Sequence, residues 1–124
     1  MQKSKLIVGV AVVIGITAGP VLGASPASAA PSGCVANVYK YQDRHDCVRK
    51  IQAILNYDRF RGQLSTFPVD GHFGAVTDGR VRKVQNDWWI GVDGVVGRGT
   101  WGVLCSHAVG QMSNVQKAAG CASV

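Results

Sequence analysis

The order of apolar and polar residues along this chain predicts three amphipathic helices. The first covers Asp46–Asn56, because its apolar residues recur three and four positions apart and therefore share one helix face. That face comprises Val48, Ile51, Ile54 and Leu55, with Cys47 at its border. Asp46 is a favourable N-cap residue, since its carboxylate can accept a backbone N–H of the first turn.

A second helix is expected from Ala75 until Gly91 ends it, and a short third helix from Arg98 to Leu104. The apolar stripe of the second helix is narrow and consists of Thr77, Val81, Val84 and Trp88. In the third helix, Trp101 and Leu104 lie on the inner face. The pattern therefore predicts an all-α fold, a compact three-helix module.

The same nine-residue pattern introduces each of the last two helices. It is VDGHFGAVT at Val69–Thr77 and VDGVVGRGT at Val92–Thr100. Asp-Gly is a strong turn signal, because Gly tolerates positive φ and Asp hydrogen-bonds neighbouring backbone N–H groups. We interpret both copies as helix-starting turns of the scaffold. The residues given this structural role are Asp70, Gly71, Gly74, Thr77, Asp93, Gly94, Gly97 and Thr100.

The apolar residues around each Asp-Gly pair are expected to anchor the turn in the core. Val69 and Val92, directly before each Asp, are predicted to point inward. Phe73 and Val96, three residues after each Asp, are predicted to do the same from the other side. The turns lack the alternating carboxylates of a calcium loop, so no calcium site is expected.

The first 29 residues have the composition of a secretory signal peptide. Lys3 and Lys5 form a basic start, Leu6–Gly19 is apolar, and Ala27-Ser28-Ala29 is a small-x-small cleavage pattern. A retained membrane anchor is the alternative, but the apolar stretch is shorter than the ~20 residues of a spanning helix. We therefore expect a secreted chain, extracellular or bound to the cell wall, that has no membrane contact after cleavage.

Beyond the signal peptide we expect an N-terminal arm at 30–42, one domain at 43–105 and a tail at 106–124. All four cysteines lie in this exported part, and an even count in a short exported chain predicts two disulfides. No two cysteines have the C-x₂₋₄-C spacing of a structural zinc site. Two pairings stay open. A local one, which we favour, joins Cys34 to Cys47 and Cys105 to Cys121, and a nested one joins Cys47 to Cys105 and Cys34 to Cys121.

Charge and side-chain chemistry exclude several classes of function. The formal net charge is +6, of which two lysines lie in the predicted signal peptide. The positive charge left on the exported part favours contact with anionic surfaces such as cell-wall polymers. This charge is too small and too scattered to indicate nucleic-acid binding. The chain has no Glu, and none of its three histidines occurs in an H-E-x-x-H spacing. We predict no enzymatic activity, no metal and no cofactor.

Four motifs in the same order resemble a known family. They are V-x-x-I-Q-x-I-L-N at Val48–Asn56, V-D-G-x-F-G-x-x-T at Val69–Thr77, V-x-x-V-Q at Val81–Gln85 and V-D-G-V-V-G-x-x-T-W-x-x-L at Val92–Leu104. This series resembles the peptidoglycan-binding domain found at the ends of many bacterial wall hydrolases, over about Asp43–Cys105. The resemblance implies a three-helix module that holds bacterial cell wall and carries out no chemistry.

The surface between the two turns is the predicted ligand site. Trp89 is the aromatic residue expected to be exposed for stacking on a sugar ring, whereas Trp88 and Trp101 are expected in the core. Gln85 is expected to supply a hydrogen bond at the rim. The charged candidates, for carboxylates of stem peptides or wall phosphates, are Arg59, Arg61 and Arg98, and His72 is either a surface residue or a rim contact.

These observations lead to one main hypothesis and two alternatives. The main hypothesis is a secreted, non-catalytic, monomeric protein that binds peptidoglycan through its glycan or its stem peptide. The first alternative is a small secreted protein-interaction or inhibitor module that keeps the fold and uses the basic loop Tyr57–Pro68 as its interface. The second is an accessory module that directs a separately encoded wall hydrolase.

Overall fold

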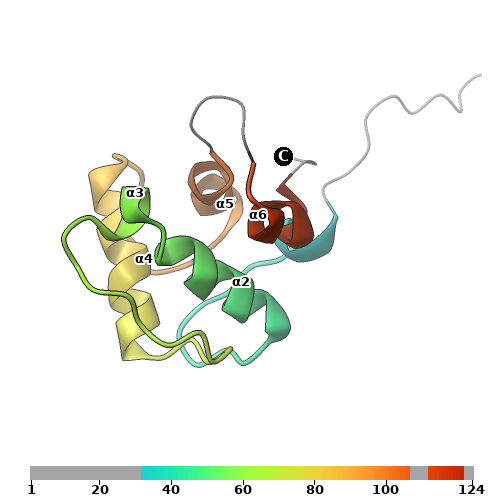
Figure 1. Ribbon diagram of the computed structural model, residues 1–124, viewed down its shortest axis with the longest axis horizontal. Helices are drawn as coiled ribbons and strands as arrows, with labels where there is room; N and C mark the ends of the chain where they lie inside the picture. Colours follow the sequence, from blue (N-terminus) through green and yellow to red (C-terminus); the bar gives the residue numbers. More distant parts are fainter. Residues whose placement is uncertain (1–31, 107–111, 122–124) are drawn as a thin grey trace, which may run out of the picture.

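The computed structural model describes residues 32–106 and 112–121, so the predicted signal peptide lies outside the described residues. This part of the chain is all-α, as predicted, and is shown in Figure 1. Its only β-type pairings are isolated bridges between Tyr39 and Val96 and between Arg44 and His72. The elements are η2 (Gly33–Ala36), α2 (Asp46–Leu55), α3 (Asp58–Arg61), α4 (Ala75–Asp87), α5 (Arg98–Leu104) and α6 (Asn114–Ala119).

Helix α2 is the central element, and α3, α4, α5 and α6 all pack against it (Figure 1). Its predicted apolar face is fully buried, as are Phe73 and Val96 after the two Asp-Gly pairs. Trp101 is the largest side chain in the core and its indole N–H donates to the backbone oxygen of Asn37 at 3.2 Å. Burial of each large apolar side chain contributes roughly 1.5–3 kcal/mol to the free energy of folding. This cluster is therefore the main source of stability in the described residues.

Helix α2 begins with a different cap from the one predicted. His45 is the N-cap residue, and its Nδ1 atom accepts the backbone N–H of Cys47 at 3.0 Å. Asp46 is the first helical residue instead, and its carboxylate forms an ion pair with Lys50 one turn later. The carboxylate therefore stabilises the helix through a side-chain pair, and the imidazole satisfies the free N–H group.

Helix α4 ends earlier than predicted, at Asp87 rather than next to Gly91. Trp89 has a φ of 57°, in the left-handed region, and this conformation stops the helix. Trp88, expected in the core, is half-buried at the helix end and packs against the core.

Two helices were not predicted. The loop Tyr57–Pro68 contains α3, which buries Phe60 against the core. The tail contains α6, which begins with a capping box in which Ser113 and Gln116 satisfy each other's backbone N–H groups. The described module therefore has five α-helices and a 3₁₀ turn rather than three helices.

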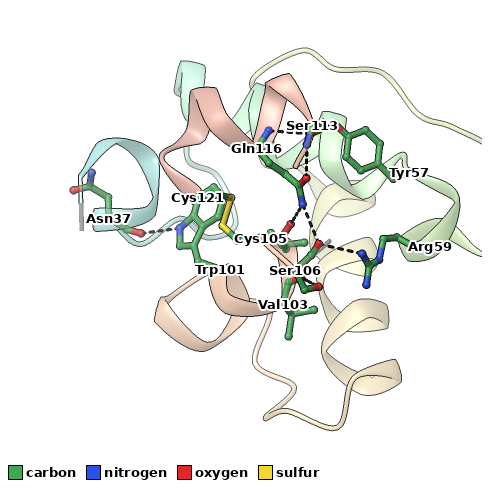
Figure 2. The surroundings of a disulfide bond; sticks show 11 residues. Asn37, Tyr57, Arg59, Trp101, Val103, Cys105, Ser106, Ser113, Gln116 and Cys121 are labelled. Atoms are coloured by element: carbon green, nitrogen blue, oxygen red, sulfur yellow. Dashed lines mark hydrogen bonds between the residues drawn. A yellow bond between two sulfur atoms is a disulfide. The ribbon is translucent and has the colours of Figure 1, made fainter. Parts of the chain in front are cut away.

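Both disulfides follow the local pairing, Cys34 with Cys47 and Cys105 with Cys121. The second one attaches α6 to the end of α5, as Figure 2 shows. Beside it the side-chain amide of Gln116 donates to the backbone oxygens of Leu104 at 2.8 Å and Ser106 at 3.0 Å. Helix α6 is thus held on α2 and on the end of α5 by packing, a disulfide and hydrogen bonds.

No helix among the described residues is long and apolar enough to cross a membrane.

Candidate wall-binding site

A buried glutamine from the preceding helix organises the first repeated turn. The Nε2 atom of Gln52, on α2, donates to the carboxylate of Asp70 at 2.9 Å, the backbone oxygen of His72 at 3.0 Å and the hydroxyl of Thr77 at 3.1 Å. Its Oε1 atom accepts the backbone N–H of Gly71 at 2.8 Å. One side chain therefore connects the beginning, middle and end of this turn.

The second turn repeats this arrangement around Gln85, on α4. Its Nε2 atom donates to Asp93 at 2.9 Å, to the backbone oxygen of Val95 at 3.0 Å and to the hydroxyl of Thr100 at 3.0 Å. Its Oε1 atom accepts the backbone N–H groups of Asp93 and Gly94. Gln85 is 1% exposed. The predicted hydrogen bond from Gln85 to a ligand at the rim does not fit this structure, because the turn already uses its whole amide.

The carboxylates of the two turns are held in the ionised form. The pKa of Asp70 is lowered, mainly because its carboxylate accepts the backbone N–H of His72 and then the amide of Gln52. The pKa of Asp93 is lowered in the same way by the N–H of Val95 and by Gln85. Hydrogen bonds made to the charged form stabilise it, so these carboxylates serve as acceptors within the turns.

The two Asp-Gly glycines need their conformational freedom. Gly71 has a φ of 79° and Gly94 a φ of 74°, values that residues with a Cβ rarely adopt. Both glycines are buried under charged side chains, Gly71 near Arg49 and Gly94 beneath the ion pair of Asp78 and Arg82. At its Asp-Gly glycine each turn is therefore covered by side chains of the preceding helix, while the aspartate beside that glycine is exposed.

The expectation that the valine before each Asp points inward is wrong. Val69 is 42% exposed and Val92 is 49% exposed. Neighbouring side chains of an extended backbone point to opposite sides. Because Asp70 and Asp93 turn toward their glutamines, the valines before them face solvent.

The N-terminal arm joins the two turns. Tyr39 and Val96 exchange backbone hydrogen bonds of 3.2 and 2.8 Å, which attach the arm to the second turn. The backbone of Gln42–His45 pairs with the first turn at Gly71 and Phe73. A hollow of about 330 Å³ lies along this arm and is lined by Asn37, Val38, Tyr39, Asp43, Arg44 and His45.

Trp89 is the most exposed large apolar residue of the described chain, with 93% of its surface accessible. It follows the last turn of α4 in the left-handed conformation, which costs a residue other than glycine about 1–2 kcal/mol. Its predicted exposure agrees with the structure.

A second hollow, of about 290 Å³, begins directly after Trp89. We call it the second-turn hollow, and it is lined by Ile90, Gly91, Asp93, Val95, Gly97, Arg98, Gly99 and Thr100. Arg98 is exposed, and within the described residues its guanidinium makes no hydrogen bond or ion pair. The sequence pattern predicts Trp89 and Arg98 as ligand residues, but it contains no signal for the open glycines Gly91, Gly97 and Gly99 of this hollow.

The other two predicted arginines lie along α3. The guanidinium of Arg59 stacks over the rings of Phe60 and Trp88, each at 5.2 Å, and donates to the backbone oxygen of Ser106 at 3.1 Å (Figure 2). Arg61 forms an ion pair with Asp58 and donates to the backbone oxygen of Leu64. Arg59 thus lies next to Trp88, while the charge of Arg61 is already paired.

His72 is separate from the other predicted ligand residues. It is half-buried in the first turn, where it pairs with Arg44 through an isolated bridge. The thirteen residues of α4 lie between this turn and Trp88, a length of roughly 20 Å at 1.5 Å per residue. The structure therefore gathers Trp89 and Arg98 at one end of α4, with Arg59 nearby, and leaves His72 at the other.

Comparison with known proteins agrees with this architecture. Residues 44–104 match a family whose description is "Putative peptidoglycan binding domain". The match begins just before α2 and ends with the last residue of α5, so it includes both glutamine-centred turns. The domain formed by these residues belongs to the peptidoglycan-binding domain family. The searches of curated proteins and of solved structures found no match.

Proposed function

We propose that this chain is a secreted, non-catalytic, monomeric protein that binds peptidoglycan. The observation that carries the proposal is the match of residues 44–104 to the family described as a putative peptidoglycan binding domain. The described residues outside the match include η2 and α6. Each of these elements is joined by a disulfide to a helix of the matched domain or to the end of one, so we do not propose a second domain.

A binding role without chemistry is supported by how the reactive side chains are used. Asp70 and Asp93 accept hydrogen bonds within the turns, and His45 caps α2. All four cysteines are in disulfides. Among residues 32–106 and 112–121, no three His, Cys, Asp or Glu side chains are grouped so that they could hold a metal ion.

Secretion is supported by the signal-like first 29 residues and by the disulfides, which form and persist in oxidising compartments. The basic charge favours an anionic wall. For ligand contact we propose Trp89 and Arg98 first and Arg59 second, because these residues lie at the same end of α4. Arg61 and His72 are proposed as lesser contacts, since one is ion-paired and the other is at the opposite end of α4.

Co-sedimentation of residues 30–124 with purified peptidoglycan sacculi tests the proposal. We expect saturable pelleting at low salt and none with cellulose particles of equal mass. We also expect no fall in the turbidity of the sacculi over hours, because no bond is cleaved. Protein that stays in the supernatant, or sacculi that dissolve, would overturn the proposal.

The alternative hypotheses make different predictions in the same assay. An inhibitor or protein-interaction module would remain in the supernatant yet bind an exported protein through residues 57–68. An accessory module would pellet, and it would also increase the rate at which a separate hydrolase dissolves the sacculi.

A further inference from the structure

Trp89 occupies a backbone position that normally belongs to glycine. After α4, the backbone N–H of Ile90 donates to the oxygen of Gln85 at 3.0 Å, and that of Trp89 donates to the oxygen of Asn86 at 3.2 Å. These two bonds define a Schellman motif, in which the left-handed residue is Trp89. At the end of α6 the corresponding left-handed residue is Gly120. Glycine adopts this conformation without strain, and tryptophan does not.

The side chain of Trp89 does not pack in the core of the described residues. Its side chain is 93% exposed, so its largest apolar surface faces water, whereas the neighbouring Trp88 packs against Phe60 with ring centroids 5.8 Å apart. The backbone hydrogen bonds of the motif need no side chain at all. A strained conformation that holds an apolar ring in solvent indicates that the ring has a use outside the fold.

The second-turn hollow, whose lining begins at Ile90 directly after Trp89 in the chain, is open at its glycines. A Cβ atom added to Gly91, Gly97 or Gly99, which line the second-turn hollow, would meet no atom within 4 Å. At about 290 Å³ the hollow is slightly below the usual 300–1,000 Å³ of small-molecule sites, so it suits a single ring-sized group. Arg98 offers unused donors there, and Asp93 offers its Oδ2 atom, because the bonds from Gln85 and from the backbone of Val95 both end at Oδ1.

We propose that Trp89 and the second-turn hollow bind one pyranose residue of the wall glycan, and not the stem peptide. This inference rests on the proposed function and names the part of peptidoglycan that the site recognises. A pyranose has a flat face of C–H groups that covers an indole ring, and an edge of hydroxyl groups. The hydroxyl groups donate to Asp93 and the oxygen substituents accept from Arg98. A free carboxylate of a stem peptide would pair with Arg98 but be repelled by Asp93, and a stem peptide has no flat face of C–H groups to cover the indole ring.

The first test replaces Trp89 by glycine, the residue that the backbone prefers. We expect Trp89→Gly to raise or preserve the unfolding midpoint and to weaken binding to peptide-free glycan strands at least tenfold. Trp89→Phe, which keeps an aromatic face, should retain more than a third of the affinity. A Trp89→Gly protein that is folded and binds these strands within twofold of the unmodified chain would overturn the inference.

The second test fills the hollow and leaves the ring in place. Gly99 and Gly102 are both exposed on α5, and a Cβ at either meets nothing within 4 Å, but only Gly99 lines the hollow. We expect Gly99→Gln to weaken glycan binding at least fivefold and the matched Gly102→Gln to leave it unchanged. Equal effects of the two substitutions would contradict the assignment of the hollow.

Binding to intact sacculi and binding to peptide-free glycan strands are measured separately, so that failure of this inference can be told apart from failure of the proposed function. Binding to intact sacculi together with no binding to glycan strands freed of peptide by an amidase would overturn the inference and leave the proposed function standing. No binding to sacculi at all would overturn both. Binding to intact sacculi and to the freed strands with similar affinity per disaccharide is the result that we expect.

Discussion

The amide of Gln85 and the carboxylate of Asp93 are joined by a 2.9 Å hydrogen bond that repeats, at the same length, the bond between Gln52 and Asp70. The partners are eight residues apart in one case and eighteen in the other. The repeated unit is therefore a helix end plus a turn. The longer connection in the first copy contains α3, which lies on the core without disturbing the glutamine.

Removing either glutamine should destabilise the domain strongly. We expect Gln85→Ala to lower the free energy of unfolding by about 3 kcal/mol, because backbone N–H groups of the buried turn lose their acceptor. Gln52→Ala should have a similar effect. Urea unfolding followed by circular dichroism measures both, with exposed Gln63→Ala as the control at within about 0.5 kcal/mol. Equal stability of all three variants would contradict the role of the buried amides.

The turns should also make stability depend on pH in acid. The folded-state pKa values of Asp70 and Asp93 are lowered by hydrogen bonds to the charged form. Their contribution is thus fully present above the unfolded pKa of about 3.9 and is lost as the pH falls through the folded values. We expect the urea midpoint to fall from pH 5 toward pH 2, and to fall less in Asp70→Asn. An unchanged slope in that variant would assign the acid sensitivity to other groups, such as Asp46, whose pKa is also lowered.

Two glycine substitutions should have opposite effects. Gly94→Ala forces a Cβ into a left-handed turn under Asp78 and Arg82, and should cost about 1–2 kcal/mol. Gly79→Ala lies in the middle of α4 with open space around the new atom, and should stabilise the domain by about 1 kcal/mol. Thermal unfolding of both variants measures the difference. Stabilisation by Gly94→Ala would show that the second turn does not need its left-handed residue.

The C-terminal disulfide should support the fold without forming the binding site. Replacing Cys105 and Cys121 by serine removes a cross-link between residues 16 positions apart, worth about 3 kcal/mol. We expect this loss in the free energy of unfolding, while affinity for sacculi at 10 °C stays within twofold. A loss of affinity in a folded variant would place α6 at the ligand surface.

Sequence patterns predicted the scaffold well for a physical reason. Helical spacing marks the face of α2 that is buried, and the Asp-Gly pairs mark turns whose glycines have positive φ. Both signals are local, so they need no knowledge of which segments meet. The capping residue Ser113 followed three positions later by Gln116 is also a local signal of a helix start, but the small, polar residues around it predicted a tail, and α6 was not expected.

The candidate site was less predictable because it depends on contacts between distant segments. Helical spacing placed Gln85 at the border of the buried face of α4. In the folded domain the second turn packs around its side-chain amide, so that Gln85 is buried. The left-handed conformation of Trp89 has no sequence signal, since glycine is the usual residue there. The side chain of Trp89 was assigned correctly as exposed, whereas the reason for its exposure needed the backbone geometry.

An NMR titration tests the central claim most directly, namely that this domain binds peptidoglycan at the second turn. Amide chemical shifts of residues 30–124 would be followed while soluble glycan-peptide fragments, released from sacculi by a muramidase, are added. We expect saturable shifts at Trp89–Gly91 and at Arg98–Gly99, with the hollow along the N-terminal arm unchanged. Shifts confined to the hollow at Asn37–His45, or none at saturating fragment, would contradict it.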